Sequence, residues 1–383
     1  MSRVQTPVIP VVADLIRRHP GTISLGQGVV YYGPPPEAEA AMREGLLAPD
    51  IHKYKPVTGM PALVDAWAAK LRHENGLETG KRSRLVVTAG GNLAFYNAIL
   101  AVADEGDEVI LPLPYYFNHE MAIVMAHARP VLAPTGPDYH LLPDRLRALV
   151  TPKTRAIVTV SPNNPTGAVY REEELRAVNE LCREKGLFHI HDEAYEYFAW
   201  DGMKVVSPGG FEGAEDHTIS LYSLSKAYGF ASWRIGFMTM PADLLEPVRK
   251  IQDTLLICAP AVSQLAALGA LRAGRAYCEA RSQMIAGNRS LLRQKLRRLE
   301  GKLEFNEPEG AFYVMVRLPG TRSSMACVER LVEQAGVAVI PGSAFGLEKE
   351  CALRVAYGAL ETREAGEAFD RLVNGLERLL GEN

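Results

Sequence analysis

The residues best suited to chemistry lie in the segment Ser223–Gly236, which reads SLSKAYGFASWRIG. An apolar run ends at Ser223, and Lys226 follows three residues later. A lysine at the carboxyl end of a parallel strand lies where open α/β sheets bind ligands. The hydroxyls of Ser223 and Ser225, together with Arg234, would make this an oxyanion or phosphate site. A solvated loop with a surface arginine is the competing interpretation of this cluster alone.

A second segment, residues 85–100, predicts a cradle for an anion. A strand-like run leads into Gly90 and Gly91, and a helical pattern begins at Asn92. Glycines let backbone amides approach a ligand, and the N-terminus of a helix favours negative charge. The segment lacks the P-loop pattern, and GQG at 26–28 lacks the third glycine of a dinucleotide fingerprint. The prediction is therefore a phosphate site of another kind.

A carboxylate and an amide follow two further strand-like runs. Asp192 ends the run LFHIHD, and a carboxylate in a dry cleft is costly unless it meets a cation or donor. Asp192, with Tyr195 three residues on, could therefore hold a protonated heterocycle nitrogen. Asn164 lies in the loop SPNNPTG, which by itself is also consistent with a plain turn. His189 and His191 share a strand face, but without a third ligand nearby we expect core histidines and no metal site.

The elements that must position these residues alternate between strands and helices from about residue 84 to 240. The strand-like runs are LVVT (85–88), VILP (109–112), PVLAP (130–134), AIVTV (156–160), LFHI (187–190), ISLY (219–222) and IGFMTM (235–240). They lack polar alternation, which is typical of strands buried on both faces of a sheet. Helical patterns between them imply parallel pairing. We therefore expect a doubly wound α/β domain with about seven, mostly parallel strands.

The rest of the chain predicts a second, smaller α+β domain. Residues 261–300 have the pattern of one long helix or two, and short strands and helices follow Gly301. We expect a large domain over residues 38–275 and a small domain made of residues 1–37 and 276–383.

Composition narrows the class of protein. The 383 residues carry 42 Lys and Arg against 45 Asp and Glu, a net charge of −3, so nucleic acid is not an expected partner. Hydrophobic residues make up 47%, which excludes disorder, collagen and coiled coil as the main architecture. No stretch reaches the roughly 18 apolar residues of a membrane span. The five cysteines are scattered without a C-x-x-C, which suits the reducing cytosol, so we expect a cytoplasmic enzyme.

The motifs gain specificity from their order. A glycine–helix turn, an Asn-Pro-Thr-Gly loop, a strand-end aspartate and a strand-end lysine follow one another at positions 90, 164, 192 and 226. In this combination the chain resembles the class I/II aminotransferases, pyridoxal-phosphate enzymes of fold type I. The resemblance runs from ISLGQGV (23–29) through the Tyr54–Gly59 motif to LRVAYG (353–358).

The resemblance implies pyridoxal 5′-phosphate as cofactor and gives residues roles around its ring. Lys226 matches the lysine that forms a Schiff base with the cofactor and moves the substrate Cα proton. Asp192 matches the carboxylate that pairs with the pyridinium nitrogen, so that the ring acts as an electron sink. Asn164 and Tyr195 match the residues on the ring hydroxyl. Tyr116 matches the aromatic stacked on the ring, with its two chain neighbours as competitors.

The resemblance also implies phosphate and substrate ligands. The phosphate ligands are Gly91 and Asn92 through backbone amides, and Ser223, Ser225 and Arg234 through side chains. Tyr54 matches a tyrosine that reaches the phosphate of the neighbouring subunit, which implies a homodimer with shared sites. Arg354 matches the arginine that grips the substrate α-carboxylate with two parallel hydrogen bonds, near Asn164 and the backbone of Gly28.

The activity implied is transfer of an amino group between an L-amino acid and a 2-oxo acid, with the cofactor alternating between pyridoxal and pyridoxamine forms. The stretch Val29–Gly33 is apolar and aromatic, without an arginine for a second carboxylate. We expect it to face the substrate and to favour apolar, aromatic or methionine side chains. His119 is either a substrate contact or a surface residue.

Two alternatives stay open at this point. The first is a lyase, synthase or oxidase that uses the same cofactor, because small pocket changes decide the outcome. The second is a non-catalytic regulator, against which the presence of Lys226, Asp192 and Arg354 together argues.

Overall fold

A central sheet of seven strands organises the computed structural model, which describes residues 1–320 and 322–381. The strands are β2 (Ser83–Thr88), β3 (Glu108–Pro112), β4 (Arg129–Ala133), β5 (Thr154–Val160), β6 (Phe188–Asp192), β7 (Thr218–Ser223) and β8 (Gly236–Pro241). Their order in the sheet is β2-β8-β7-β6-β5-β3-β4. Every neighbouring pair is parallel except the two that involve β8. The predicted seven-stranded, mostly parallel sheet is confirmed.

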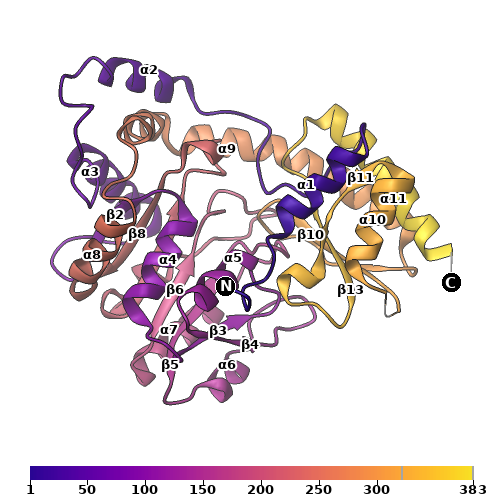
Figure 1. The fold of residues 1–383 in the computed structure, drawn as a ribbon, viewed down its shortest axis with the longest axis horizontal. Helices are drawn as coiled ribbons and strands as arrows, with labels where there is room; N and C mark the ends of the chain where they lie inside the picture. The colour runs from indigo at the N-terminus through magenta and orange to yellow at the C-terminus, as the bar shows by residue number, and fades with distance from the viewer. Residues whose placement is uncertain (321, 382–383) are drawn as a thin grey trace.

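Helices cover both faces of this sheet (Figure 1). They are α4 (Gly91–Val102), α5 (Phe117–Met125), α6 (Pro143–Leu149), α7 (Glu172–Lys185) and α8 (Leu245–Leu255). Successive side chains of a strand point to opposite faces. Val109 and Leu111 of β3 therefore pack in the cluster of α4, α5 and α8, whereas Ile110 packs in the cluster of α6 and α7. Burial on both faces explains why these strands are apolar throughout.

A four-stranded antiparallel sheet lies at the other end of the molecule, beside helices α10 and α11 (Figure 1). Its strands are β9 (Glu304–Phe305), β10 (Tyr313–Leu318), β12 (Ile340–Pro341) and β13 (Cys351–Ala356). The helices are α10 (Ser324–Ala335) and α11 (Thr362–Gly381). Near them β1 (Ile23–Ser24) pairs with β11 (Val337–Ala338), so N-terminal chain joins C-terminal chain. The exact domain division at residues 38 and 275 stays a prediction.

Helix α9 (Ala261–Leu296) contacts helices from both ends of the chain. Inside it Gly274 has φ +61° and ψ −158°, so this element consists of two helical pieces, as one of the sequence alternatives had it. Its contacts include α2 (Pro36–Gly45), α3 (Pro61–Lys70) and α11. Helix α1 (Val8–Arg18) contacts α10 and β12. Within the described residues, no helix is long and apolar enough to cross a membrane.

Candidate active site

A cavity of about 110 Å³ lies where five strands of the central sheet end. Strands β2, β3, β5, β6 and β7 run in one direction, so their carboxyl ends meet at one edge, where open sheets bind ligands. The lining residues are Gly91, Asn92, Tyr116, Val160, Asn164, Asp192, Ala194, Tyr195, Ser223, Ser225, Lys226 and Arg234. All except Val160 and Ala194 were singled out from the sequence, and the structure brings them together.

Arg234 and the start of α4 form a part of this cavity suited to an anion. The Arg234 guanidinium donates from Nη1 to the Ala231 carbonyl at 2.9 Å and contacts Ser225 Oγ at 3.5 Å. Gly90 precedes the helix with φ +85°, and a Cβ there would lie 2.3 Å from Arg234 Nη2. Glycine is therefore required for the arginine to approach the amides at the helix N-terminus.

Asp192 is held in place by two donors. Its Oδ1 accepts a hydrogen bond from the Ala194 amide at 3.0 Å, and its Oδ2 lies 3.2 Å from His119 Nε2. The His119 ring is stacked on Phe95 with centroids 3.9 Å apart and is only 2% exposed. The expectation of a surface or substrate-contacting His119 is wrong, because α5 buries this ring behind Tyr116, outside both site cavities.

A larger cavity of about 300 Å³ adjoins the first. Its lining residues are Pro7, Ile9, Pro10, Gly28, Tyr116, Phe117, Asn118, Asn164, Tyr195, Lys226, Tyr313 and Arg354. The two cavities share Tyr116, Asn164, Tyr195 and Lys226. Of the three neighbouring aromatics considered for the ring contact, Tyr116 is the one that lines both cavities.

Arg354 lies on β13 and is almost completely buried at 2% exposure. Its Nη1 donates to Asn164 Oδ1 at 3.0 Å and its Nη2 to the Gly26 carbonyl at 2.5 Å. The guanidinium lies between the rings of Tyr313 and Phe345. Its Nε has no hydrogen-bond partner among the described residues, and a buried donor left in this state is suited to an anionic ligand.

Lys226 lies between the two cavities, and its Nζ donates to the Gly28 carbonyl at 2.5 Å. Burial, together with the positive charges of Arg354 and Arg234, lowers the pKa of this amine to about 8, although Asp192 acts in the opposite direction. A lysine of this kind is uncharged often enough near neutral pH to act as a nucleophile or base.

Two sequence expectations lie outside these cavities. Tyr54 is 81% exposed and lines neither of them within one chain. The stretch Val29–Gly33, expected to face the substrate, does not line the larger cavity. Tyr32 instead packs beneath the loop of Lys226 and donates to the Ala227 carbonyl at 3.3 Å. Tyr32 thus supports the lysine loop in this chain, and the contact of this stretch with the substrate stays a prediction.

Sequence reasoning missed the residues that close the larger cavity. Pro7, Ile9 and Pro10 come from the N-terminal segment, and Tyr313 begins β10. The short N-terminal segment before the first motif gave no catalytic signal. Tyr313 stood in a run that was recognised only as a strand.

The histidine pair of β6 belongs to the core. His189 Nε2 and His191 Nδ1 lie 2.7 and 2.6 Å from the Thr159 hydroxyl, and both rings are fully buried. Burial lowers the pKa of both imidazoles, so they are neutral at physiological pH. Across the described residues, no group of three or more His, Cys, Asp or Glu is arranged to hold a metal ion.

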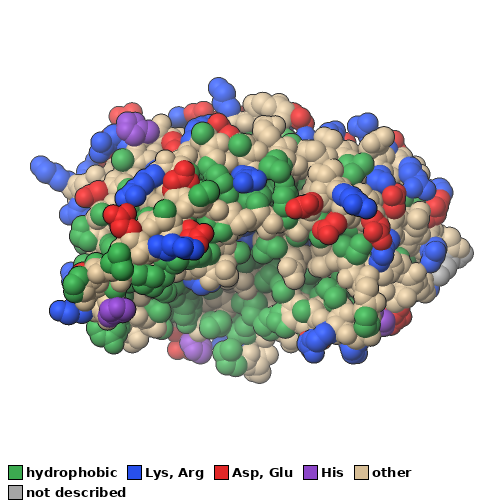
Figure 2. All heavy atoms as spheres, turned by 90° about the horizontal axis from the view of Figure 1, so that it is seen from above, with side chains coloured by type: hydrophobic (Ala, Val, Ile, Leu, Met, Phe, Trp, Pro, Cys, Tyr) green, Lys and Arg blue, Asp and Glu red, His purple; other side chains and the backbone are tan. Residues whose placement is uncertain are grey.

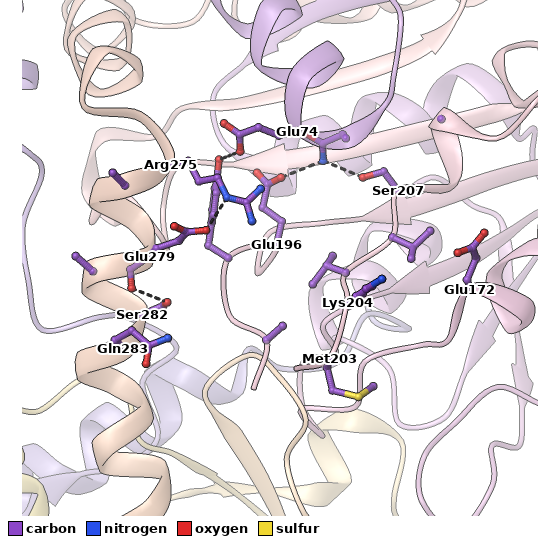
Figure 3. Close-up of a pocket in the computed structure, with 18 of the residues that line it drawn as sticks. Glu74, Glu172, Glu196, Met203, Lys204, Ser207, Arg275, Glu279, Ser282 and Gln283 are labelled. Carbon is purple, nitrogen blue, oxygen red and sulfur yellow. Dashed lines mark hydrogen bonds and ion pairs between the residues drawn. The ribbon is translucent and has the colours of Figure 1, made fainter. Parts of the chain in front are cut away.

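A cavity of about 940 Å³, larger than either of these two, lies away from these residues, between α9 and the segment 196–211 (Figure 3). Several of its charged residues are paired locally. Arg275 donates to Glu279 at 2.6 Å, Tyr197 donates to Glu74 at 2.6 Å, and Glu196 pairs with Lys70. Cavity volume alone therefore does not identify the candidate site. The polar and charged side chains that meet in the two smaller cavities identify it.

The smaller cavity has the donors and acceptors that pyridoxal 5′-phosphate requires. Arg234, two serine hydroxyls and helix amides suit a phosphate, and a buried carboxylate suits a protonated ring nitrogen. Asn164 Nδ2 and Tyr195 Oη, 3.3 Å apart, suit a ring oxygen. The amine of Lys226, which lines the cavity, suits an aldehyde. The residues present fit the cofactor.

Comparison with known proteins gives one family over most of the chain. The sequence profile described as aminotransferase class I and II matches residues 20–372.

Individual relatives match at similar levels. An aromatic aminotransferase of Arabidopsis thaliana is 35% identical over 383 residues, covering 98% of this chain and 94% of the relative. A probable aspartate/prephenate aminotransferase of Aquifex aeolicus is 35% identical over 348 residues, covering 88% and 84%. The solved structure of the Thermus thermophilus aspartate aminotransferase with maleate superposes with a TM-score of 0.90 at 32% identity, covering 98% of both chains.

Proposed function

The chain belongs to the class I and II aminotransferases, which use pyridoxal 5′-phosphate, and we propose that its substrates are aromatic or other apolar L-amino acids, methionine included, and 2-oxo acids. The observation that carries the substrate proposal is the make-up of the larger cavity. Its single arginine, Arg354, is suited to the α-carboxylate, while Pro7, Ile9 and Phe117 offer an apolar wall to the side chain. An aminotransferase with this wall favours apolar substrates.

Aspartate is the main competing substrate, because relatives carry names of both kinds. Its second carboxylate would need a second cation. Among the described residues lining the larger cavity, the cations are Arg354 and Lys226, and Lys226 is assigned to the cofactor. An arginine from a partner subunit would favour aspartate as substrate, so aspartate is compared with phenylalanine and methionine in the test of this proposal.

The assigned roles follow from the chemistry of each group. The phosphate is assigned to Gly91, Asn92, Ser223, Ser225 and Arg234, the ring to Tyr116, the ring oxygen to Asn164 and Tyr195, and the ring nitrogen to Asp192. When bound, the cofactor supplies an electron sink for the bond between Cα and its hydrogen. Lys226 would hold the cofactor through Nζ and, once released, would take the proton from Cα and deliver it to the carbon that had been the cofactor's aldehyde. Arg354 orients the substrate by its carboxylate.

Asp192 keeps a proton on the ring nitrogen because an ionised carboxylate stabilises a nearby positive charge. His119 and the Ala194 amide occupy its two oxygens and fix its orientation. His119 is thus a positioning residue for this carboxylate.

A homodimer is the proposed assembly, with Tyr54 reaching the phosphate of the partner subunit. The support is its 81% exposure and the exposed apolar residues Leu46, Leu47, Leu255 and Leu256. Figure 2 shows hydrophobic side chains gathered over part of the face viewed from above. Patches of this kind mark contact surfaces. Sedimentation of the protein as a monomer at micromolar concentration would contradict this assembly.

The division into residues 38–275 and 1–37 with 276–383 is proposed as two bodies that approach when substrate binds. The break at Gly274 supports a boundary near residue 275. Small-angle scattering that is unchanged by a substrate analogue would contradict closure. We also place the enzyme in the cytoplasm, because its five cysteines are free thiols.

The absorbance spectrum of the purified protein tests the proposal directly. We expect a visible band from the lysine-bound cofactor, absent in Lys226→Ala. Phenylalanine or methionine, added without a 2-oxo acid, should replace this band by the near-ultraviolet band of the pyridoxamine form. Aspartate should do so more slowly at equal concentration.

Two results would overturn separate parts of this proposal. Faster conversion by aspartate than by phenylalanine would refute the substrate class. The absence of a visible band after adding pyridoxal 5′-phosphate would refute the role of Lys226.

A further inference from the structure

Tyr313 brings a second tyrosine hydroxyl into the site from the C-terminal part of the chain. Its Oη lies 2.8 Å from Tyr195 Oη, and both side chains are almost fully buried. Tyr313 lines only the larger cavity, whereas Tyr195 lines both. The resemblance that identified Tyr195 gave no role to Tyr313.

Gly28 leaves the space in which this hydroxyl lies. A Cβ at Gly28 would be 2.4 Å from Tyr313 Oη, so no larger residue fits without displacing the tyrosine. The Gly28 carbonyl also accepts the hydrogen bond of Lys226. The Tyr313 hydroxyl is therefore built into the same wall as the catalytic lysine.

The two hydroxyls end a chain of hydrogen bonds that starts at Arg354. Arg354 Nη1 donates to Asn164 Oδ1 at 3.0 Å, and Asn164 Nδ2 donates to Tyr195 Oη at 3.3 Å. A hydroxyl has one proton to donate and two lone pairs with which to accept. If Tyr195 gave its proton to Tyr313, none would remain for a ligand in the smaller cavity. If Tyr313 donates, Tyr195 accepts twice and its own proton is free to point into that cavity.

The charges around the pair favour Tyr313 as the donor. Its ring lies under the Arg354 guanidinium, 4.6 Å from ring centroid to Cζ. Burial raises the pKa of Tyr313 to about 12, and the arginine opposes this rise. Burial raises the pKa of Tyr195 well above its usual value, and Tyr313 adds to that rise. A guanidinium this close to the Tyr313 ring stabilises negative charge on its oxygen and makes its hydroxyl the better donor of the two.

We infer that Tyr313 is a positioning residue whose hydroxyl donates to Tyr195 and thereby commits the Tyr195 proton to the ring oxygen of the cofactor. The inference rests on the proposed function. Donors in series strengthen one another, so Tyr313 also makes Tyr195 a stronger donor.

The test is the pH titration of the visible band in holoenzyme. A donor to the ring oxygen lowers the basicity of that oxygen, so the proton shared with the lysine nitrogen leaves at lower pH. Tyr313→Phe weakens the Tyr195 donor and should raise the apparent pKa of the band by about 0.5. Tyr195→Phe should raise it further. The double variant should match Tyr195→Phe alone, because Tyr313 acts through Tyr195.

Tyr357→Phe is the matched control. Tyr357 is also buried, but its hydroxyl accepts from Trp200 Nε1 at 3.2 Å and lies outside both cavities. Removal of the Tyr357 hydroxyl should leave the apparent pKa of the visible band unchanged. If Tyr313→Phe does not fold, Tyr313→His retains a ring donor and should titrate close to wild type.

Different outcomes would contradict the role of Tyr313 and the proposed function. A wild-type protein without a visible band would refute the cofactor role of Lys226 and leave nothing to titrate. A normal band that titrates identically in wild type and Tyr313→Phe, while Tyr195→Phe shifts, would overturn the role of Tyr313. A fall in pKa would also overturn it, because it would mean that Tyr195 had been donating to Tyr313.

Discussion

At the residue scale, Lys226 and Arg354 are cations in one dry site with different tasks. Arg354 donates to Asn164 and to the Gly26 carbonyl, its other donors remain available to a ligand, and its charge persists at any accessible pH. Lys226 has a single carbonyl partner and a lowered pKa. The arginine is suited to hold a carboxylate, and its charge helps keep the lysine deprotonated enough to react.

The lowered pKa of Lys226 predicts how the cofactor-free protein takes up pyridoxal 5′-phosphate. Only the neutral amine attacks an aldehyde, and the pKa of this amine is about 8. The rate constant should rise about tenfold per pH unit below pH 8 and level off above it. Stopped-flow absorbance from pH 6 to 10 measures this. A rate still climbing at pH 10 would indicate an ordinary, unshifted lysine.

Replacing Arg354 by lysine should raise KM for the amino donor and lower kcat/KM by roughly 10²-fold. Lysine keeps the charge but loses the planar pair of hydrogen bonds, which is worth about 2–3 kcal/mol. Steady-state kinetics with phenylalanine would measure the loss. Arg317→Lys serves as control, because Arg317 lies on the neighbouring strand and pairs with surface glutamates. Equal effects in both variants would contradict the assignment.

At the scale of elements, the turn from β2 into α4 joins the sheet to the anion site. Gly90 has a positive φ, and a Cβ added there would lie 2.3 Å from Arg234 Nη2. The adjoining Gly236 likewise has the Gly90 and Gly91 backbone closer than 3.0 Å to any added Cβ. The two glycines let the helix start, the arginine and β8 lie against one another.

Gly90→Ala should therefore weaken cofactor binding about tenfold or more, because inserting a methyl group here costs roughly 1–3 kcal/mol. Equilibrium dialysis against pyridoxal 5′-phosphate gives the affinity. Gly106→Ala is the matched control, since Gly106 also has a positive φ but nothing within 4 Å of the added Cβ. A similar loss in both would trace the effect to backbone strain instead of to Arg234.

His140 links three elements by ion pairs. Its Nδ1 lies 3.0 Å from Glu174 in the first turn of α7, and its Nε2 lies 3.0 Å from Glu309 before β10. Glu309 also accepts from the Val169 amide, just after the Asn164 loop. Hydrogen bonds to Glu174 and Glu309 raise the pKa of His140 to about 9.

The raised pKa of His140 fixes the sign of a pH effect on stability. The ion pairs contribute fully below the unfolded value near 6.5, and the contribution is lost as pH rises through about 9. The loss should be on the order of 1–3 kcal/mol, because each unit of difference between the folded and unfolded pKa values corresponds to about 1.4 kcal/mol. Urea unfolding at pH 6 and pH 9 should show this loss of unfolding free energy in the wild type. The variant His73→Gln, at an exposed histidine, is the control and should show the same loss. If His140→Gln shows the same pH dependence, the pairs do not stabilise the fold.

The sequence allowed prediction of the central sheet and of most of the cofactor cavity because both depend on local signals. Buried strands are apolar throughout, and the residues after them fall at one sheet edge by topology alone. The residues that were missed depend on contacts between distant segments. Tyr313 meets Tyr195 across 118 positions, and the His119 ring is buried only because α5 packs on Phe95 of α4. No local pattern carries that information.

At the scale of the whole molecule, the substrate cavity is enclosed by the beginning, middle and end of the chain. Pro7, Ile9 and Gly28 come from the start, Lys226 from the central sheet, and Arg354 from the last strand. Gln5 donates to Glu120 of α5 at 3.0 Å and ties the N-terminal segment to the sheet domain. No contiguous half of the chain contains a complete site.

Ile9→Ala tests whether the N-terminal segment contacts the substrate side chain. Removing its apolar surface should raise KM for phenylalanine about fivefold and leave alanine as donor little affected, because about 1 kcal/mol of contact is lost. Val11→Ala is the control, since Val11 lies on the same helix and is 39% exposed. Equal changes for both donors would show that the segment senses only the common part of the substrate.

The placement of the two chain ends bears on how the protein should be produced. In the view of Figure 1 the N-terminal residues lie over the central part of the picture, whereas α11 (Thr362–Gly381) lies at its edge. An affinity tag placed before Met1 would lie within a few residues of Pro7, which lines the larger cavity. Purification through the C-terminal end avoids this interference and leaves the entrance in its native form.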